Sequence, residues 1–161
     1  HASAESLSKS FVTFVEDDPL IGDVNDAAKK IHQKLKEIES STKPTAIVWG
    51  GETTVKIKGS GLGGRNQELA LIVAELAHQD PIRKPWTFLS GGTDGRDGPT
   101  EAAGAIVDQE TCQRILNEGY QVYDFLAENN SNKALQISND LLHTGATGTN
   151  VADVQILIVS Q

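Results

Sequence analysis

Three things that this chain lacks narrow its class before any motif is considered. The 161 residues contain a single cysteine, Cys112, so no internal disulfide can form, and this usage fits a reducing compartment. The longest strongly apolar stretch, residues 69–76, is far too short to span a bilayer. Basic residues are outnumbered, 14 against 22 acidic ones, and the net charge of −8 argues against general nucleic-acid binding. We therefore expect no nucleic-acid and no membrane partner.

The N-terminal residues also lack the apolar run that a secretory signal peptide needs. Together with the single cysteine, this favours the cytoplasm. The mitochondrion stays open, because the chain reads as a piece of a longer protein whose own N-terminus lies elsewhere. The length suffices for one domain with a full core and an appended arm.

What the chain does contain is a set of glycine-rich polar loops, each of which follows a short apolar run. The three loops are residues 50–53 after 46–49, residues 90–98 after 86–89, and residues 144–150 after 141–143. Apolar runs of this length that end in glycine are typical of buried strands. In open α/β sheets, ligands bind beyond the carboxyl ends of the strands. We therefore expect the loops to meet at one sheet edge and to face one anionic ligand.

The order of these segments predicts an α/β layered domain, with a mixed β-sheet flanked by helices and preceded by an N-terminal helical arm. Residues 1–45 are interpreted as the arm and linker, and residues 46–161 as the α/β domain. Helices are expected at 5–16, 23–39, 65–78, 109–117, 123–128 and 132–137. Strands are expected at 46–49, 54–58, 86–89, 105–107, 140–143 and 154–159. The first two strands, and the last two, are too close in sequence for a crossover helix, so some pairs must be antiparallel.

A fourth glycine-rich segment, residues 59–64, opens the helix expected at Arg65. Its glycine spacing matches the dinucleotide fingerprint, but Lys56 and Lys58 are atypical of a strand buried on both faces. We favour an anion-binding loop, in which free N–H groups at the helix start face the ligand and Arg65 adds a fork of donors. A turn that only permits close packing is the structural alternative.

Two aspartates, Asp94 and Asp97, lie three positions apart in the loop that follows residues 86–89. Carboxylate oxygens suit Mg²⁺, which usually takes one or two carboxylates plus the phosphates of a substrate. Asx-turns that shape the loop are an equally open role for both residues.

The last loop and Glu52 offer further polar groups. Hydroxyl, amide and backbone groups of residues 147–150 suit a phosphate or polar substrate, although a plain hairpin turn has the same composition. Glu52 faces either a ligand or a backbone N–H group at the turn.

Taken together, four blocks of the chain resemble the MOFRL domain, the C-terminal half of type-2 glycerate kinases. The blocks are residues 50–55, 63–68, 92–104 and 147–153. The resemblance implies ATP-dependent phosphorylation of D-glycerate, with ATP and Mg²⁺ as cofactors. It also implies an active site shared with the parent's own N-terminal domain, which the chain does not contain, and it leaves a homodimer open. One departure is Asn130, where the family commonly has aspartate.

On this basis we assign Arg65 and Asp94 as catalytic residues, and Asp94 and Asp97 as Mg²⁺ ligands. The residues assigned to substrate or phosphate binding are Glu52, Gly63, Gly64, Asn66, Gly91, Gly92, Thr93, Thr147, Gly148, Thr149 and Asn150. Two other functions stay in competition. The isolated chain is expected to be a non-catalytic substrate-binding or structural domain, and the glycine fingerprint keeps open an NAD(P)-dependent hydroxypyruvate reductase.

Overall fold

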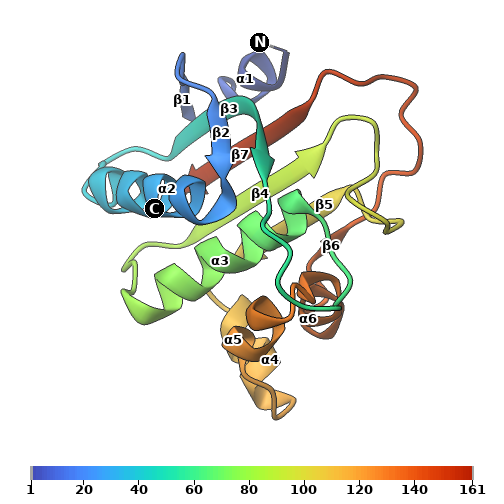
Figure 1. Ribbon diagram of the computed structural model, residues 1–161. Coiled ribbons are helices and arrows are strands. Elements are labelled where there is room, and N and C mark those ends of the chain that lie inside the picture. The colour runs from blue at the N-terminus through green and yellow to red at the C-terminus, as the bar shows by residue number, and fades with distance from the viewer. Residues whose placement is uncertain (1, 161) are drawn as a thin grey trace.

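The computed structural model describes residues 2–160, and its strands form one mixed sheet. The strands are β1 (Val12–Val15), β2 (Leu20–Asp23), β3 (Thr45–Thr54), β4 (Trp86–Gly92), β5 (Gly104–Asp108), β6 (Leu141–Leu142) and β7 (Asp153–Val159). Their order is β1-β3-β7-β4-β5-β6, with β2 also beside β3 (Figure 1). Both β1 and β2 run parallel to β3, and the remaining pairs are antiparallel. The mixed α/β sheet expected from the sequence is confirmed.

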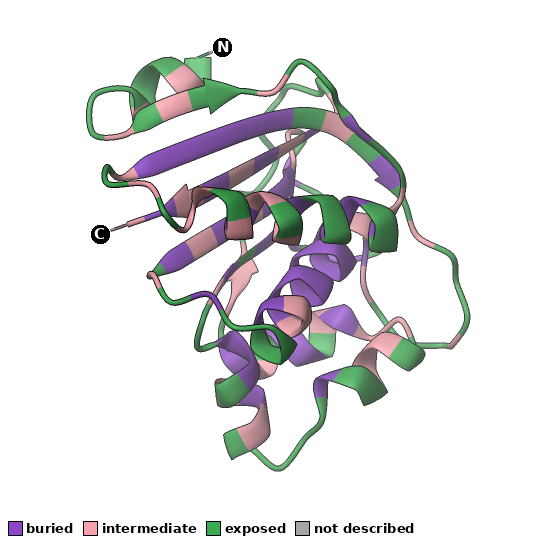
Figure 2. Cartoon of the chain, turned by 90° about the vertical axis from the view of Figure 1, so that its left-hand side faces the viewer, coloured by how far each residue is buried: buried purple, intermediate pink, exposed green. Residues whose placement is uncertain are grey.

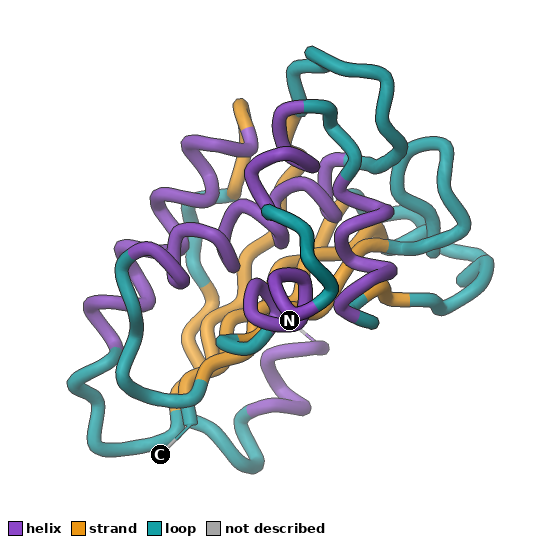
Figure 3. Tube along the Cα trace, turned by 90° about the horizontal axis from the view of Figure 1, so that it is seen from below, coloured by secondary structure: helices purple, strands orange, loops and turns teal. Residues whose placement is uncertain are grey.

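The helices lie unequally on the two faces of this sheet. They are α1 (Ala2–Leu7), α2 (Val24–Ile38), α3 (Arg65–Gln79), α4 (Thr111–Asn117), α5 (Val122–Ala127) and α6 (Ser131–Ser138). Helices α2 to α6 lie on one side of the strands, and α1 lies on the other side beside β1 and β3 (Figure 3). The buried core lies between the sheet and α2 and α3 (Figure 2). Within residues 2–160, no helix combines the length and apolar character that crossing a membrane requires.

The two long helices begin and end close to their predicted positions. Asp23 caps α2, since its Oδ1 accepts a hydrogen bond from the backbone N–H of Asn25 at 2.8 Å. The apolar face of α2, which includes Ile31 and Leu35, is buried against the sheet and α3. Helix α3 is buried on most sides, as its nearly continuous apolar run predicts.

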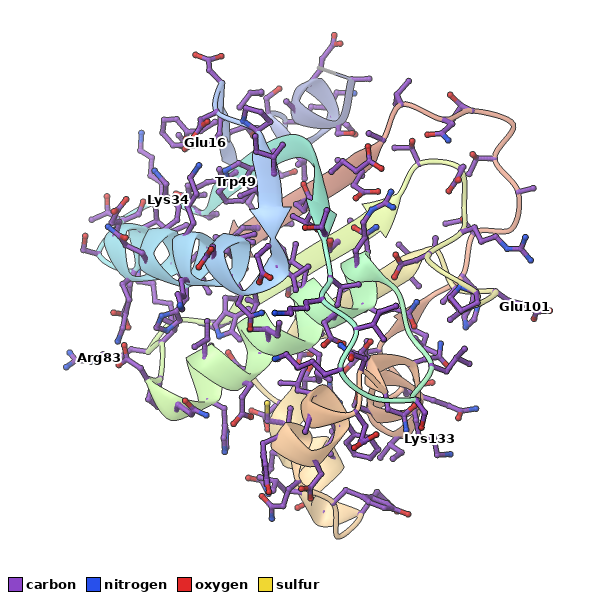
Figure 4. All side chains as sticks on the ribbon, viewed as in Figure 1. Glu16, Lys34, Trp49, Arg83, Glu101 and Lys133 are labelled. Atoms are coloured by element: carbon purple, nitrogen blue, oxygen red, sulfur yellow. The ribbon has the colours of Figure 1, made fainter. Side chains whose placement is uncertain are left out.

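The helix predicted over residues 5–16 is wrong beyond Leu7. Residues 12–15 instead form β1, which lies in parallel register with residues 45–48 of β3. The apolar residues here have helical spacing, but the segment also contains β-branched residues and lies beside a strand that can accept another partner. Pairing with β3 therefore determines the structure. Glu16, just after β1, pairs with Lys34 of α2 at 3.2 Å (Figure 4). Thus β1 and β2 belong to the same sheet as the later strands.

Two strand predictions also need correction. Residues 46–49 and 54–58 are not an antiparallel pair, because one strand, β3, runs through Gly50 and Gly51 and ends at Thr54. Gly51 permits this continuation, since a Cβ there would lie 2.1 Å from the carbonyl oxygen of Leu20 in β2. In addition, β6 pairs with β5 rather than with β7, because the loop of residues 143–152 carries the chain across to the centre of the sheet.

Candidate functional site

The loop after β4 and the loop before β7 lie side by side at one end of the central strands, on the right of Figure 1. Strand β7 starts there, and its first residue, Asp153, lies between Gly51 of β3 and Gly92 of β4. The loop after β4 and the loop before β7 are joined through Thr93. Its Oγ1 donates to the carbonyl oxygen of Ala152 at 2.7 Å and accepts from the N–H of Val151 at 2.8 Å. The structure therefore brings together segments that are far apart in the sequence.

Arg65, the first residue of α3, reaches into this edge and is held there by an ion pair. Its Nε and Nη2 donate to the two carboxylate oxygens of Asp153 at 2.7 and 2.9 Å. Nη2 also lies 3.6 Å from Oε1 of Glu52, which comes from β3. The bond to Asp153 raises the pKa of Arg65, so its positive charge is secure. Within the part of the chain that the structure describes, Nη1 has no hydrogen-bond partner.

Part of the N-terminus of α3 is already occupied by another segment of the chain, whereas we expected its N–H groups to be free for an anionic ligand. The carboxylate of Asp97 occupies it, accepting from the N–H groups of Asn66 at 3.1 Å and Gln67 at 2.9 Å. The Gln67 side chain adds a further bond at 2.9 Å. A Cβ on Gly64 would lie 2.3 Å from Cγ of Asp97, so glycine is required for this close approach. The helix start is thus an anion site filled from within the chain.

Asn66 and Asp97 are both buried, and their side chains bind other groups of the protein. Asn66 is fully buried, and its amide oxygen accepts from the hydroxyl of Ser90 at 2.6 Å. Asp97 is only 2% exposed, and its burial raises its pKa while the bonds from Gln67 and Asn66 oppose that rise. Both carboxylate oxygens of Asp97 already accept from the protein. The geometry therefore does not fit Asp97 as a Mg²⁺ ligand.

Asp94 has the opposite surroundings. It is exposed, and one oxygen, Oδ1, accepts from the N–H of Arg96 at 3.0 Å in an Asx-turn. Its other oxygen is not engaged by any group among residues 2–160. The described residues contain no group of three or more His, Cys, Asp or Glu side chains that could hold a metal. Of the two aspartates proposed for Mg²⁺, only Asp94 offers an oxygen.

Residues 58–62 do not form a ligand-binding fingerprint loop. Their N–H groups bond to the segment that precedes α6: Oδ1 of Asn129 accepts from Lys58, the carbonyl oxygen of Glu128 from Gly61, and Oδ1 of Asn130 from Leu62. The residues before the loop are not a strand either. A dinucleotide fingerprint needs a buried strand directly before the loop, which is absent here, and Asp97 already occupies two N–H groups of the following helix. The nicotinamide interpretation therefore has no structural support.

A pocket of about 740 Å³ opens beside Arg65. Four of the residues predicted to form the site line it, namely Glu52, Gly63, Gly64 and Arg65, together with the polar residues Thr53 and Thr54. Its apolar wall includes Ile57, whose side chain is well exposed.

The other predicted residues lie outside this pocket. The loop residues Thr147, Gly148, Thr149 and Asn150 are exposed beside Thr93 and Asp94, and the hydroxyl of Thr147 donates to the carbonyl oxygen of Thr93. Gly91 and Gly92 form the end of β4.

Two residues at this edge were not assigned by the sequence reasoning. Asp153 is the carboxylate that holds Arg65, and the available signal was an acidic residue opening an alternating apolar strand. Thr53 lines the pocket, and its buried hydroxyl has no hydrogen-bond partner among the described residues. No local sequence pattern distinguishes Thr53 from its neighbour Thr54.

The fold and the site define a class: an α/β domain in which an arginine at a glycine-rich end of the sheet lines a pocket. The chain belongs to the MOFRL family, whose sequence pattern matches residues 45–153. It is 46% identical over 134 residues to the glycerate kinase of Homo sapiens, covering 81% of this chain and 26% of that protein. It is 41% identical over 163 residues to the D-glycerate 2-kinase of Thermotoga maritima, covering 97% of this chain and 38% of that protein.

A solved structure supports the same relationship. The crystal structure of a glycerate kinase from Thermotoga maritima matches with a TM-score of 0.88 and 40% identity, over 96% of this chain and 37% of that one. The chain therefore spans well under half the length of the relatives that it matches.

Proposed function

We propose that this chain is the C-terminal domain of an ATP-dependent glycerate kinase and supplies one wall of an active site that another domain completes. The observation that carries the proposal is the 41% identity to a D-glycerate 2-kinase across 97% of this chain. The pocket beside Arg65 agrees with it, since an open, partly apolar pocket with one unsatisfied guanidinium edge suits a small anionic substrate.

In this reaction the γ-phosphoryl group of ATP passes to a glycerate hydroxyl, ADP leaves, and the hydroxyl proton is released. Such transfers depend mainly on positioning and on neutralising charge. Nη1 of Arg65 would bind the glycerate carboxylate or the transferring phosphoryl group. The free oxygen of Asp94 would orient the attacking hydroxyl. The exposed groups of Thr147, Thr149 and Asn150 would bind substrate oxygens.

Mg²⁺ enters this proposal as the partner of ATP. Because Asp97 is saturated and Asp94 offers one oxygen, this chain fits a metal held chiefly by phosphates and by at most one of these two carboxylates. Bound in that way, the ion would neutralise the phosphate charge. The name of the relative from Thermotoga maritima specifies a 2-kinase, and we propose phosphorylation of the 2-hydroxyl on that basis.

In the decisive experiment, the protein at its natural length is incubated with D-glycerate and Mg-ATP. In a separate mixture it is incubated with hydroxypyruvate and NADH or NADPH. We expect ADP and a phosphoglycerate from the first mixture, with ³¹P NMR distinguishing the 2-phosphate from the 3-phosphate. We expect no oxidation of the nicotinamide in the second. Oxidation without ADP formation would establish the reductase instead.

The 161-residue chain alone should form no ADP under the same conditions, since it supplies only one wall of the site. Clear turnover by the chain alone would show that the other domain is not needed for catalysis.

A further inference from the structure

Asp153 is a buried charge whose place in the sheet is unusually well defined. It opens β7, the strand between β3 and β4, and its backbone lies opposite Gly51 on one side and Gly92 on the other. Its side chain is 0% exposed. An ionised carboxylate buried to this degree needs a charged, hydrogen-bonded partner, because leaving it unpaired is strongly destabilising. Arg65 supplies that partner through two bonds of 2.7 and 2.9 Å.

Two carboxylates from different segments thus fix the first turn of α3. Asp97 binds the backbone N–H groups that follow Arg65, which sets where the helix starts. Asp153 binds the guanidinium group, which sets where the side chain points. A bidentate arginine–carboxylate pair fixes the plane of the guanidinium as well as its position.

The geometry also determines which edge of the guanidinium stays available. Nε and one N–H of Nη2 are committed to Asp153, and Nη2 is near Glu52. Nη1 is left without a partner among residues 2–160, on a side chain that lines the pocket with Gly63 and Gly64. Asp153 itself does not line the pocket.

We infer that Asp153 is a positioning residue for the reaction: it never touches the substrate and acts by presenting the Nη1 edge of Arg65 to the anion in the pocket. This inference rests on the proposed kinase function. A guanidinium already oriented before substrate binds spares the reaction the cost of ordering it, and misplacement by about 1 Å lowers the rate by up to about 10²-fold.

The test is a double-mutant cycle in the protein at its natural length, with kcat and KM measured for Asp153→Asn, Arg65→Lys and the double variant. Asparagine keeps the shape of aspartate but loses the charge and one acceptor oxygen. We expect Asp153→Asn to lower kcat/KM at least about tenfold. The kcat/KM of the double variant should lie within about threefold of that of the less active single variant. Effects that simply multiply would overturn the inference, as would Asp153→Asn with unchanged kcat/KM.

A second variant and a control separate positioning from general loss of structure. Asp153→Glu keeps the charge but displaces the guanidinium by one methylene, so it should lose kcat/KM even where circular dichroism shows a folded protein. Full activity of Asp153→Glu would overturn the inference, and this variant decides the matter if Asp153→Asn fails to fold.

Asp140→Asn is the matched control. Oδ1 of Asp140 lies 2.6 Å from Nη2 of Arg114, and neither residue lines the pocket. This variant should lower the melting temperature and leave kcat/KM within about twofold of the unmodified protein. An equal loss of kcat/KM in this control would mean that general destabilisation explains both, against the inference. An unmodified protein without glycerate kinase activity would instead refute the proposed function itself.

Discussion

Arg65 and Arg114 look alike by every simple measure, yet they differ in what their guanidinium groups have left to bind. Their side chains are 35% and 34% exposed, and each lies near two carboxylates. All three side-chain nitrogens of Arg114 bind other groups of the protein. Nε donates to the carbonyl oxygen of Ser138, Nη1 pairs with Asp108, and Nη2 binds Thr111 and Asp140. Arg65 keeps Nη1 unused within the described chain. The two arginines therefore do not differ in exposure, but they do differ in the donors that remain for another group to bind.

The same contrast holds for the helix starts in the two regions. The N-terminus of α3, at the glycine-rich edge, is capped by Asp97, a residue from a distant loop. Helices α4, α5 and α6 begin without a side-chain cap. A side chain from a distant loop therefore binds the first N–H groups of α3, whereas no side chain among residues 2–160 does so at the starts of α4, α5 and α6.

The largest effect is expected from Asp97→Ala, which leaves the buried N–H groups of Asn66 and Gln67 without an acceptor. The free energy of unfolding should fall by about 3 kcal/mol, measured by urea denaturation. Glu110→Ala at the start of α4 is the control and should change it by less than about 0.5 kcal/mol, since that side chain makes no cap. Equal losses at both positions would erase the contrast between the helix starts.

The next effect distinguishes the two arginines by activity. Arg65→Lys should lower kcat/KM of the protein at its natural length at least about tenfold, about 1.4 kcal/mol, because a point charge cannot replace the fork of donors. Arg114→Lys should leave kcat/KM within about twofold. Near-normal turnover by Arg65→Lys would remove this arginine from the mechanism.

Arg114→Lys should instead cost about 1 kcal/mol of stability, because one ammonium group cannot replace three hydrogen bonds and the ion pair with Asp108. Thermal unfolding of the two lysine variants, compared side by side, checks this. A fully stable Arg114→Lys protein would mean that its ion pairs are not structural.

The smallest effect concerns the thiol of Cys112, which lies on the same helix as Arg114 and donates to Oε2 of Glu75 at 3.7 Å. Burial raises the pKa of Cys112 to about 12, so between pH 7 and pH 9 the thiol stays protonated in the folded protein. Because only the thiolate reacts, alkylation by iodoacetamide at pH 8 should be at least about tenfold slower without urea than in denaturing urea. Arg114→Lys should loosen α4, which also carries Cys112, and so reduce the difference in alkylation rate between the folded and the urea-denatured protein. Arg65→Lys should leave this difference unchanged. Rapid labelling of the unmodified folded chain would show that α4 opens readily.

Sequence reasoning succeeded where the signal was local. Apolar runs that end in glycine placed β4 and its loop, and helical periodicity placed α2. The mixed character of the sheet followed from short connections. Each of these depends on neighbours within a few positions along the chain.

It failed where the partner is distant in sequence. Residues 12–15 became a strand only because the edge of β3 was free. The role of Asp97 could not be foreseen, because the N–H groups it binds belong to residues 66 and 67, 31 and 30 positions away. The same holds for Asp153, which meets Arg65 across 88 positions. A carboxylate in a loop looks the same in sequence whether it faces solvent or a helix terminus.

The position of β7 has a consequence for how this protein comes to be assembled. β7 is the last of the described strands along the chain, yet it lies between β3 and β4, which do not pair with each other directly. The two halves of the sheet therefore cannot join until residues 153–159 have left the ribosome, and earlier intermediates expose two unpaired strand edges. The synthesis of β7 therefore completes the sheet and also provides Asp153, the carboxylate that binds Arg65.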